Sequence, residues 1–351
     1  MNSADDMLVL DRPSVERCLS AIDPVDVVER TARAHARGLT RLPAEGYLAW
    51  TNGHGAYSRS LAMLGAVADS VEPVYGIKVV NAATSNPDMG IERAGGLLML
   101  FDPETARPRL LAEAAVISAL RTAAYTMLSV RHVGPEQPDV VSVLGCGALA
   151  RMHLRLFAQY FPGITRAVVF DTVPGRAQAL RDWAADGGAP SIAVAVAQDA
   201  LSCVAASDLL VTTTVSSKPY IDASWFARPA FIAHVSLDDV NEDVLRTAQA
   251  LYVDDVDLVV DNPRRVLGAV IAAGGLAKAR GADGPGLDGT LGDVLEGRVP
   301  AIRPSTGHVV SNPFGMAILD VAIGAAVEQV ALKTGEGSRM NLVQGMGRDH
   351  G

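Results

Sequence analysis

The stretch VVSVLGCGALARMHLRLF, residues 140–157, constrains the fold of this chain more than any other part of the sequence. Apolar, strand-like residues lead directly into Gly145-Cys146-Gly147, and a helical pattern begins at once. Gly145 permits a tight turn, Gly147 lets the backbone approach a phosphate, and Ala150 permits close packing of helix on strand. The unpaired N–H groups at a helix N-terminus can bind a pyrophosphate. The segment therefore predicts the strand–turn–helix unit of a dinucleotide-binding domain.

The sequence after residue 157 supports this interpretation over the length of a domain. Strand-like runs such as RAVVFD, DLLVTTTV and FIAHVSL alternate with helical patterns, which is typical of a doubly wound parallel sheet. Asp171 ends the second strand, where a carboxylate can accept hydrogen bonds from the adenosine ribose. Because that carboxylate would repel a 2′-phosphate, we predict NAD as the cofactor. The alternative is an ordinary turn followed by a surface aspartate.

Further cofactor contacts are expected at the carboxyl ends of the strands, where such sheets bind their ligands. Thr212, Thr213 and Thr214 end one strand, and Ser236 follows the strand FIAHV. The alternative for the threonines is that they only fill the strand, for which β-branched residues are well suited. The predicted cofactor-binding residues are Gly145, Gly147, Ala148, Leu149, Asp171, Thr212, Thr213 and Ser236.

The residues before 140 follow a different pattern. A helical region is followed by short strand-like runs (SLAML, YGIKVV, GLLMLF and RPRLLAE), and residues 114–132 predict one long helix that is apolar nearly all round. The late segment NPFGMAILDVAIGAAVEQVALKTG predicts a long amphipathic helix that packs on the N-terminal half. We therefore predict an α/β fold, in which a Rossmann-type, doubly wound parallel sheet, residues 134–311, is inserted into a second, α+β domain formed by residues 1–133 and 312–351.

Composition excludes several classes of function. The net charge of -9, without any Lys/Arg run, argues against a nucleic-acid partner and against binding to an anionic membrane. The acidic start MNSADDMLVL has no apolar segment of a secretory signal, and no apolar run is long enough to span a bilayer. Three scattered cysteines form no metal-ligand spacing and no disulfide framework. These features predict a cytoplasmic protein without a metal.

Two charged residues in the N-terminal half stand out because their neighbours are apolar. Arg121 lies in ISALRTAAYTML, and a buried arginine needs an anionic partner. That partner is either an acid elsewhere in the chain or a substrate carboxylate, which a guanidinium binds through two hydrogen bonds. Lys78, in YGIKVV, lies either on the exposed face of a strand, the commoner fate, or in the interior. A buried Lys78 would have a lowered pKa and could carry protons.

Arg59 in YSRSLAML and the pair Glu92-Arg93 in GIERAGG are further candidates in the same half. Taken singly, each of them is more often a surface residue than part of a site. Their grouping in one strand-rich half favours a role in substrate binding.

These segments together resemble the ornithine cyclodeaminase and mu-crystallin family over nearly the whole length of the chain. The matching segments are YSRSLAM, GIKVV, LMLFDPETARPRLLAEAAVISALRTAA, VLGCGALA and TTTVSSKPYI. Within the family, SNPDMGIERA, LGDVLEGRVP and SNPFGMAILD resemble one branch. That branch contains siderophore-pathway dehydrogenases that release 2,3-diaminopropionate from N-(2-amino-2-carboxyethyl)-L-glutamate. So long a series of ordered matches is more specific than any single motif.

The resemblance implies roles for the charged residues. Arg59 takes the place of the arginine that binds the substrate α-carboxylate, Lys78 that of the lysine beside the reacting amine, and Arg121 that of the helix arginine in the RTAA motif. In HVSLDDV, Asp238 matches the aspartate that contacts the amine in cyclodeaminases, and Asp239 matches the acid of the diaminopropionate branch. The resemblance does not decide which of the two acts.

Two positions depart from the pattern of the family. Met63-Leu64 replaces the Met-Pro that follows the arginine in the family, which implies a different local loop. Arg93 replaces a small hydroxyl residue of the cyclodeaminases. An arginine there favours a substrate with an additional carboxylate, and Glu92 is grouped with it among the substrate-binding residues.

The resemblance therefore implies an NAD-dependent enzyme that oxidatively cleaves an amino-acid-derived secondary amine. The expected substrate is N-(2-amino-2-carboxyethyl)-L-glutamate, and the expected products are L-2,3-diaminopropionate and 2-oxoglutarate. The alternatives are an ornithine cyclodeaminase, a ketimine or imino-acid reductase, and a mu-crystallin-like protein that binds a dinucleotide and a small ligand without turnover. The resemblance also implies a homodimer formed through the strands of the N-terminal domain. A pathway partner would make the conjugate from phosphoserine and glutamate.

Overall fold

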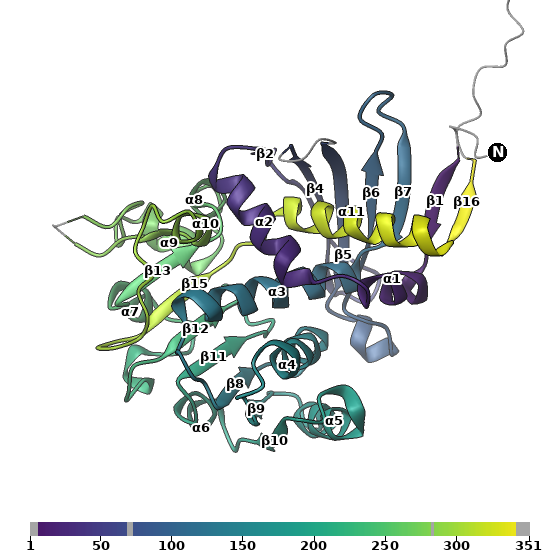
Figure 1. Cartoon of the computed structure of the whole chain (residues 1–351). Coiled ribbons are helices and arrows are strands. Elements are labelled where there is room, and N and C mark those ends of the chain that lie inside the picture. The colour runs from purple at the N-terminus through teal and green to yellow at the C-terminus, as the bar shows by residue number, and fades with distance from the viewer. Residues whose placement is uncertain (1–5, 69–72, 282–283, 342–351) are drawn as a thin grey trace, which may run out of the picture. The chain divides into compact units, whose positions relative to one another are not determined.

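The computed structural model describes residues 6–68, 73–281 and 284–341, and the chain forms two compact units (Figure 1). Unit 1 comprises residues 1–121 and 316–351, and unit 2 comprises residues 122–315. Unit 2 is thus inserted in sequence between the two parts of unit 1. The units divide inside one long helix, α3 (Ala115–Val133), whereas the sequence placed the domain boundary after this helix.

Unit 1 contains a mixed sheet with the strand order β16-β1-β7-β6-β5-β4-β2, and β3 pairs with β4. Its pairings are antiparallel except for the parallel pair β1–β7. The strands are β1 Met7–Leu10, β2 Thr40–Arg41, β3 Gly46–Thr51, β4 Tyr57–Val67, β5 Val74–Ala83, β6 Ala94–Phe101, β7 Pro108–Glu113 and β16 Ser338–Met340. The helices are α1 Arg12–Leu19, α2 Pro24–Ala36, the 3₁₀ helix η1 Asn86–Met89, and α11 Ala317–Thr334.

Helix α11 runs across the strands of unit 1 (Figure 1) and packs against β4, β5 and β6. A side chain at Gly324 would overlap Leu98, so glycine permits the close approach of helix and sheet. The sequence predicted an amphipathic helix, but α11 is apolar on nearly all sides and buries two acids, Asp320 and Glu328. In the structure this segment belongs to unit 1, together with residues 1–121.

The two faces of this sheet differ in exposure. Leu98, Leu100 and Leu110 are fully buried on the face that α11 covers. On the opposite face, apolar side chains of successive strands remain exposed, among them Leu64 at 42% and Leu97 at 52%. Since neighbouring residues of a strand point to opposite faces, unit 1 by itself leaves one apolar sheet face uncovered.

Unit 2 contains a parallel sheet with the strand order β10-β9-β8-β11-β12-β15-β13-β14. Its strands are β8 Val140–Leu144, β9 Arg166–Phe170, β10 Ala193–Val196, β11 Leu209–Thr212, β12 Phe231–His234, β13 Ala250–Val253, β14 Gly289–Thr290 and β15 Val309–Asn312. Its helices besides part of α3 are α4 Ala148–Tyr160, α5 Arg176–Trp183, the π-helix η2 Ala184–Gly188, α6 Ala200–Ala205, the 3₁₀ helix η3 Ala223–Trp225, α7 Glu242–Arg246, α8 Val256–Val260, α9 Val266–Ala272 and α10 Leu291–Leu295.

The strand order of unit 2 reverses between β8 and β11, because β9 and β10 lie on one side of β8 and the later strands lie on the other. Ligands of doubly wound sheets bind at the carboxyl ends of the strands near such a reversal. The residues of β8, β11 and β12 are buried throughout, as expected for strands with helices on both faces. The predicted Rossmann-type sheet is confirmed.

Within the described residues, no helix is long and apolar enough to cross a membrane.

Candidate functional site

The turn after β8 has the geometry that the glycine pattern predicted. Gly145 has a φ of +87°, and its N–H donates to the carbonyl oxygen of Phe170 on β9 at 2.9 Å. A Cβ at this position would lie 2.8 Å from the carbonyl of Thr213. Both the left-handed backbone and the close approach therefore require glycine.

Gly147 is the N-cap of α4, and no side chain caps this helix in the described structure. A Cβ at Gly147 would meet no atom within 4 Å, so the space in front of the helix is open. The first N–H groups of a helix have no intrahelical partners, and those of Ala148 and Leu149 lie in this first turn. The turn therefore fits the pyrophosphate of a dinucleotide.

Asp171, directly after β9, organises this turn. One carboxylate oxygen accepts the N–H of Cys146 at 2.8 Å, and the other accepts the N–H of Val173 at 2.8 Å. Asp171 is therefore more than a surface aspartate. A carboxylate has about four acceptor positions, so these two bonds leave capacity for ribose hydroxyls. The contact with a ribose stays a prediction.

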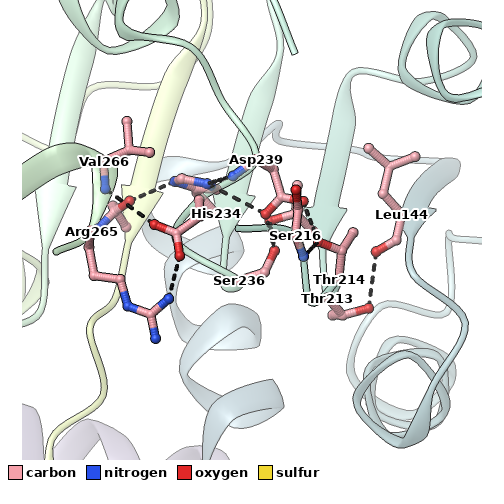
Figure 2. Close-up of polar contacts among 12 residues, drawn as sticks. Leu144, Thr213, Thr214, Ser216, His234, Ser236, Asp239, Arg265 and Val266 are labelled. Carbon is pink, nitrogen blue, oxygen red and sulfur yellow. Dashed lines mark hydrogen bonds and ion pairs between the residues drawn. The ribbon is translucent and has the colours of Figure 1, made fainter. Parts of the chain in front are cut away.

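Asp239 is fully buried at the carboxyl end of the parallel sheet and is bound by hydroxyl groups (Figure 2). Thr214 Oγ1 donates to its carboxylate at 2.5 Å and Tyr220 OH at 3.1 Å, while Ser236 Oγ makes a shorter bond. Ser236 Oγ also lies 2.8 Å from Thr212 Oγ1. The predicted residues Thr212, Ser236 and Asp239 thus belong to one network of hydrogen bonds.

His234, the last residue of β12, fixes the backbone of this network. The N–H of Asp239 donates to His234 Nε2 at 3.0 Å, so the ring proton lies on Nδ1 and is donated to Asn312 Oδ1 at 2.7 Å. Burial lowers the pKa of His234, which keeps the ring neutral. Thr213 makes separate bonds, to the carbonyl oxygens of Gly145 at 2.8 Å and Leu144 at 3.2 Å.

Asp238 has a different environment from its neighbour. Its carboxylate forms an ion pair with Arg265 and accepts the N–H of Val266 at 3.3 Å. Sequence reasoning missed Arg265, since nothing in its local sequence marks it as the partner of an acid twenty-seven residues earlier. Both aspartates proposed for catalysis are therefore already bound within unit 2, one by hydroxyl groups and the other by a guanidinium.

Lys78 is buried in unit 1, with 1% of its side chain exposed. Its Nζ lies 2.6 Å from Asp320 Oδ2 and donates to Ser118 Oγ at 3.4 Å. Burial lowers the pKa of Lys78 to about 8, although the charge of Asp320 acts in the opposite direction. Of the two positions that the strand allowed, the exposed face and the interior, the lysine side chain therefore lies in the interior, the rarer one.

Arg121 shares the same carboxylate, with Nε 3.3 Å from Asp320 Oδ2. An acid of this chain is thus a partner of Arg121, which was one of the two alternatives, the other being a substrate carboxylate. Sequence reasoning gave Asp320 no role, although one signal was present. An aspartate inside AILDVAIGAAV lies in an apolar helix, and a buried carboxylate needs cationic partners just as a buried arginine needs an anion.

Arg59 and Glu92 line a pocket of about 640 Å³ on unit 1, and Arg93 is not among its lining residues. No acidic side chain of the described residues pairs with Arg59. Glu92 instead accepts two hydrogen bonds from Arg12, at 2.8 and 2.6 Å. Within the described residues, no group of His, Cys, Asp and Glu side chains could hold a metal ion.

The chain is similar to known proteins over nearly its full length. The profile of the ornithine cyclodeaminase/mu-crystallin family matches residues 6–335. An N-((2S)-2-amino-2-carboxyethyl)-L-glutamate dehydrogenase of Staphylococcus aureus is 28% identical over 343 residues, which cover 96% of this chain and 99% of that protein.

Solved structures share the fold. The crystal structure of CmnK has a TM-score of 0.91 at 50% identity and covers 97% of this chain and 100% of that chain. A Delta(1)-pyrroline-2-carboxylate reductase of Thermococcus litoralis, in complex with NADH and L-proline, has a TM-score of 0.83 at 20% identity, covering 95% and 100%. At that lower identity the likeness concerns the fold alone.

Proposed function

The chain belongs to the ornithine cyclodeaminase/mu-crystallin family and is an NAD-dependent oxidoreductase acting on CH–NH bonds, and we propose that its substrate is N-(2-amino-2-carboxyethyl)-L-glutamate. The observation that carries the proposal is buried Lys78, held by Asp320 in the unit that also contains Arg59, for which the described residues supply no acidic partner. The whole-length similarity to a dehydrogenase of this conjugate supports it.

The proposed reaction breaks one C–N bond of the conjugate. NAD, when bound, accepts the hydride that leaves the Cα of the glutamate part, and a C=N bond remains. Water adds to this carbon, and the C–N bond then breaks to give 2-oxoglutarate and L-2,3-diaminopropionate. The nitrogen of diaminopropionate keeps the electron pair of the broken bond and takes up a proton.

Lys78 is assigned the proton transfers of this reaction. The secondary amine must lose its proton before oxidation, and the leaving amine must gain one during hydrolysis. A general acid or base works best when its pKa lies near the working pH, and the pKa of Lys78 is lowered to about 8 by burial. The carboxylate of Asp320 holds the side-chain amine of Lys78 in place, at a distance of 2.6 Å. Asp238 or Asp239 remains the proposed second acid–base group.

The conjugate carries three carboxylates, which call for cationic partners. We assign Arg59 to one of them, because Arg59 lines a pocket and has no acidic partner among the described residues. Arg121 and Arg93 are proposed for the others. Arg121 uses its Nε edge for Asp320, and a guanidinium has five N–H donors in all.

The cofactor is assigned to the turn between β8 and α4. We propose that the N–H groups of Ala148 and Leu149 bind the pyrophosphate in front of Gly147, and that Asp171 accepts from the adenosine ribose and favours NAD. Thr212, Thr213 and Ser236 are proposed for the remaining cofactor contacts at the carboxyl ends of the strands.

A homodimer is proposed to cover the exposed apolar face of the unit 1 sheet. Three free cysteines and the use of NAD support a cytoplasmic location. The chemistry of the conjugate requires an earlier enzyme that joins an activated serine, such as phosphoserine, to the amino group of glutamate.

The test is turnover of the synthetic conjugate by the purified protein with NAD. We expect NADH to accumulate together with equal amounts of 2-oxoglutarate and L-2,3-diaminopropionate, as measured by absorbance and mass spectrometry. Ammonia release from ornithine with catalytic NAD, without net NADH, would instead indicate a cyclodeaminase. Oxidation of NADH by a cyclic imino acid would indicate a reductase. Tight NADH binding without any turnover would indicate a binding protein.

A further inference from the structure

Asp239 is enclosed by hydroxyl groups at the carboxyl end of the parallel sheet of unit 2, where Figure 2 shows Thr214 and Ser236 beside it. Asp239 is 0% exposed, whereas Thr214, Tyr220 and Ser236, whose hydroxyl groups donate to its carboxylate, are half-buried. A ligand at this edge of the sheet therefore meets the hydroxyl groups and not the carboxylate.

The carboxylate determines the direction in which these hydroxyl groups bond. A carboxylate only accepts hydrogen bonds, and a hydroxyl group has one proton to donate and two lone pairs. Because Ser236 gives its only proton to Asp239, it is Thr212 that donates across the 2.8 Å between the oxygens of Thr212 and Ser236. Ser236 Oγ then keeps one lone pair. Towards a further partner, Ser236 is an acceptor and not a donor.

The backbone of this segment is held as closely as its side chains. The N–H of Asp239 donates to His234 Nε2 at 3.0 Å, and its carbonyl oxygen accepts the N–H groups of Tyr220 and Ile221 at 2.8 and 2.9 Å. Leu237 has a φ of +74°, which is uncommon for a residue with a side chain. Such a conformation persists only where the surrounding structure imposes it. Buried contacts therefore hold this loop in one conformation.

The proposed cofactor site brings the nicotinamide towards these hydroxyl groups. With the adenosine ribose at Asp171 after β9 and the pyrophosphate at the turn after β8, the dinucleotide continues along the strand order towards β11 and β12. Thr212 ends β11, and Ser236 follows β12, which ends at His234. The carboxamide group of a nicotinamide has an NH₂ group, which needs an acceptor.

We propose that Asp239 is a positioning residue, which keeps Ser236 Oγ an acceptor for the carboxamide N–H of the nicotinamide and transfers no proton itself. The inference rests on the cofactor site proposed above, and it narrows the second acid–base group to Asp238. A group that transfers protons must come within hydrogen-bond reach of the reacting atom. The hydroxyl groups that Asp239 binds stand between its carboxylate and any ligand.

The first experiment compares three reduced cofactors by calorimetric titration. They are NADH, its thionicotinamide analogue, which keeps the NH₂ group, and its 3-acetylpyridine analogue, in which a methyl group replaces it. We expect the unmodified protein to bind the acetylpyridine analogue roughly threefold to tenfold more weakly than NADH, the range for one neutral hydrogen bond. The thionicotinamide analogue should bind nearly as tightly as NADH.

Asp239→Asn tests whether the carboxylate sets this preference. Oδ1 accepts from both Thr214 and Tyr220 and Oδ2 only from Ser236, so the amide oxygen should take the place of Oδ1 and the amide nitrogen that of Oδ2. The amide nitrogen donates, so Ser236 must turn its proton away from residue 239. The ratio of the dissociation constants of the acetylpyridine analogue and NADH should therefore fall to near one.

Asp222→Asn is the matched control, because the carboxylate of Asp222 accepts from the side-chain amide of Asn241 at 2.7 Å and from none of these hydroxyl groups. It should keep the ratio of the unmodified protein. Ser236→Ala removes the acceptor itself and should also bring the ratio to near one. It carries the test if thermal melting shows that Asp239→Asn does not fold.

A ratio near one in the unmodified protein, or one that survives in Ser236→Ala, would overturn the inference. So would an Asp239→Asn variant that keeps the ratio but turns over its substrate a hundredfold more slowly, since Asp239 would then carry protons through the hydroxyl groups. Unchanged NADH binding in Gly147→Ala would remove the cofactor site on which the inference rests. The titrations need no conjugate, so the inference can be supported even where the proposed substrate is not turned over.

Discussion

Lys78 and Asp320 show how two ionisable residues can be kept together in an apolar interior. Their side chains are 1% and 0% exposed, and Arg121 contacts the same carboxylate at 3.3 Å. Removing two charges from water costs several kcal/mol per ion unless close partners compensate for it. Burying these charged side chains is therefore costly in free energy if it serves stability alone. This supports a role of Lys78 in proton transfer.

Lys78→Met should lower kcat by roughly a hundredfold or more, the usual contribution of a general acid or base. The pKa of Lys78 is lowered from 10.5 to about 8, so the neutral amine forms as the pH rises through that value. In the unmodified protein, activity that needs the neutral amine of Lys78 should increase with pH, with an apparent pKa of about 8. The variant should lose this acidic limb but still bind NADH, as fluorescence titration would show. Near-normal turnover would place the site elsewhere.

Asp320→Asn should cost about 3–5 kcal/mol in the free energy of unfolding, because Lys78 and Arg121 lose their shared counter-charge in the interior. Asp320 raises the pKa of Lys78, so its removal should move the acidic limb of the pH–rate profile to lower pH. Denaturant unfolding and pH-dependent kinetics measure the two effects. Asp26→Asn breaks an ion pair that is 60% and 65% exposed and should cost less than about 1 kcal/mol. Equal losses in both variants would contradict this account.

At the scale of elements, the turn between β8 and α4 shows why two glycines of one motif have different structural roles. Gly145 has a positive φ and is crowded by the backbone of Thr213, whereas Gly147 faces open space. The first glycine is required by the fold. The fold does not require the second, and we propose that the ligand bound in front of the helix does.

Gly145→Ala should therefore destabilise unit 2 by about 1–3 kcal/mol, the cost of a strained backbone conformation, and should weaken NADH binding. Gly147→Ala should leave the melting temperature nearly unchanged but still weaken NADH binding, because its methyl group occupies the space proposed for the pyrophosphate. Thermal melting and NADH titration of both variants test this contrast. A loss of stability in Gly147→Ala equal to that in Gly145→Ala would show that the two positions are not distinct.

The elements that sequence predicted best are those with strong local patterns. The turn at Gly145 and the alternation of strands and helices in unit 2 were visible because local sequence determines both. The partners of charged residues were not visible. Asp320 is 242 residues from Lys78, and Glu92 is 80 residues from Arg12. Such pairs depend on how the elements pack, which neither spacing nor composition reports.

At the scale of the whole molecule, the sheet of unit 1 has an exposed apolar face that a single chain leaves uncovered. Leu64 on β4, Tyr75 on β5 and Leu97 on β6 are 42%, 40% and 52% exposed. The strand registers place all three on the face opposite Lys78. Large exposed apolar patches mark interaction sites, and a second copy of the same sheet is the partner that we propose.

The dimer is tested by placing charge on this face. The double variant Leu64→Glu, Leu97→Glu should sediment as a monomer where the unmodified protein sediments as a dimer, because each interface would then bury carboxylates without partners. Leu201→Glu is the matched control, since Leu201 is 47% exposed on α6, a helix of unit 2 that contributes nothing to this sheet. The unfolding of each variant should be followed alongside, so that loss of the dimer is not confused with loss of the fold. A folded double variant that remains dimeric would exclude this face as the interface.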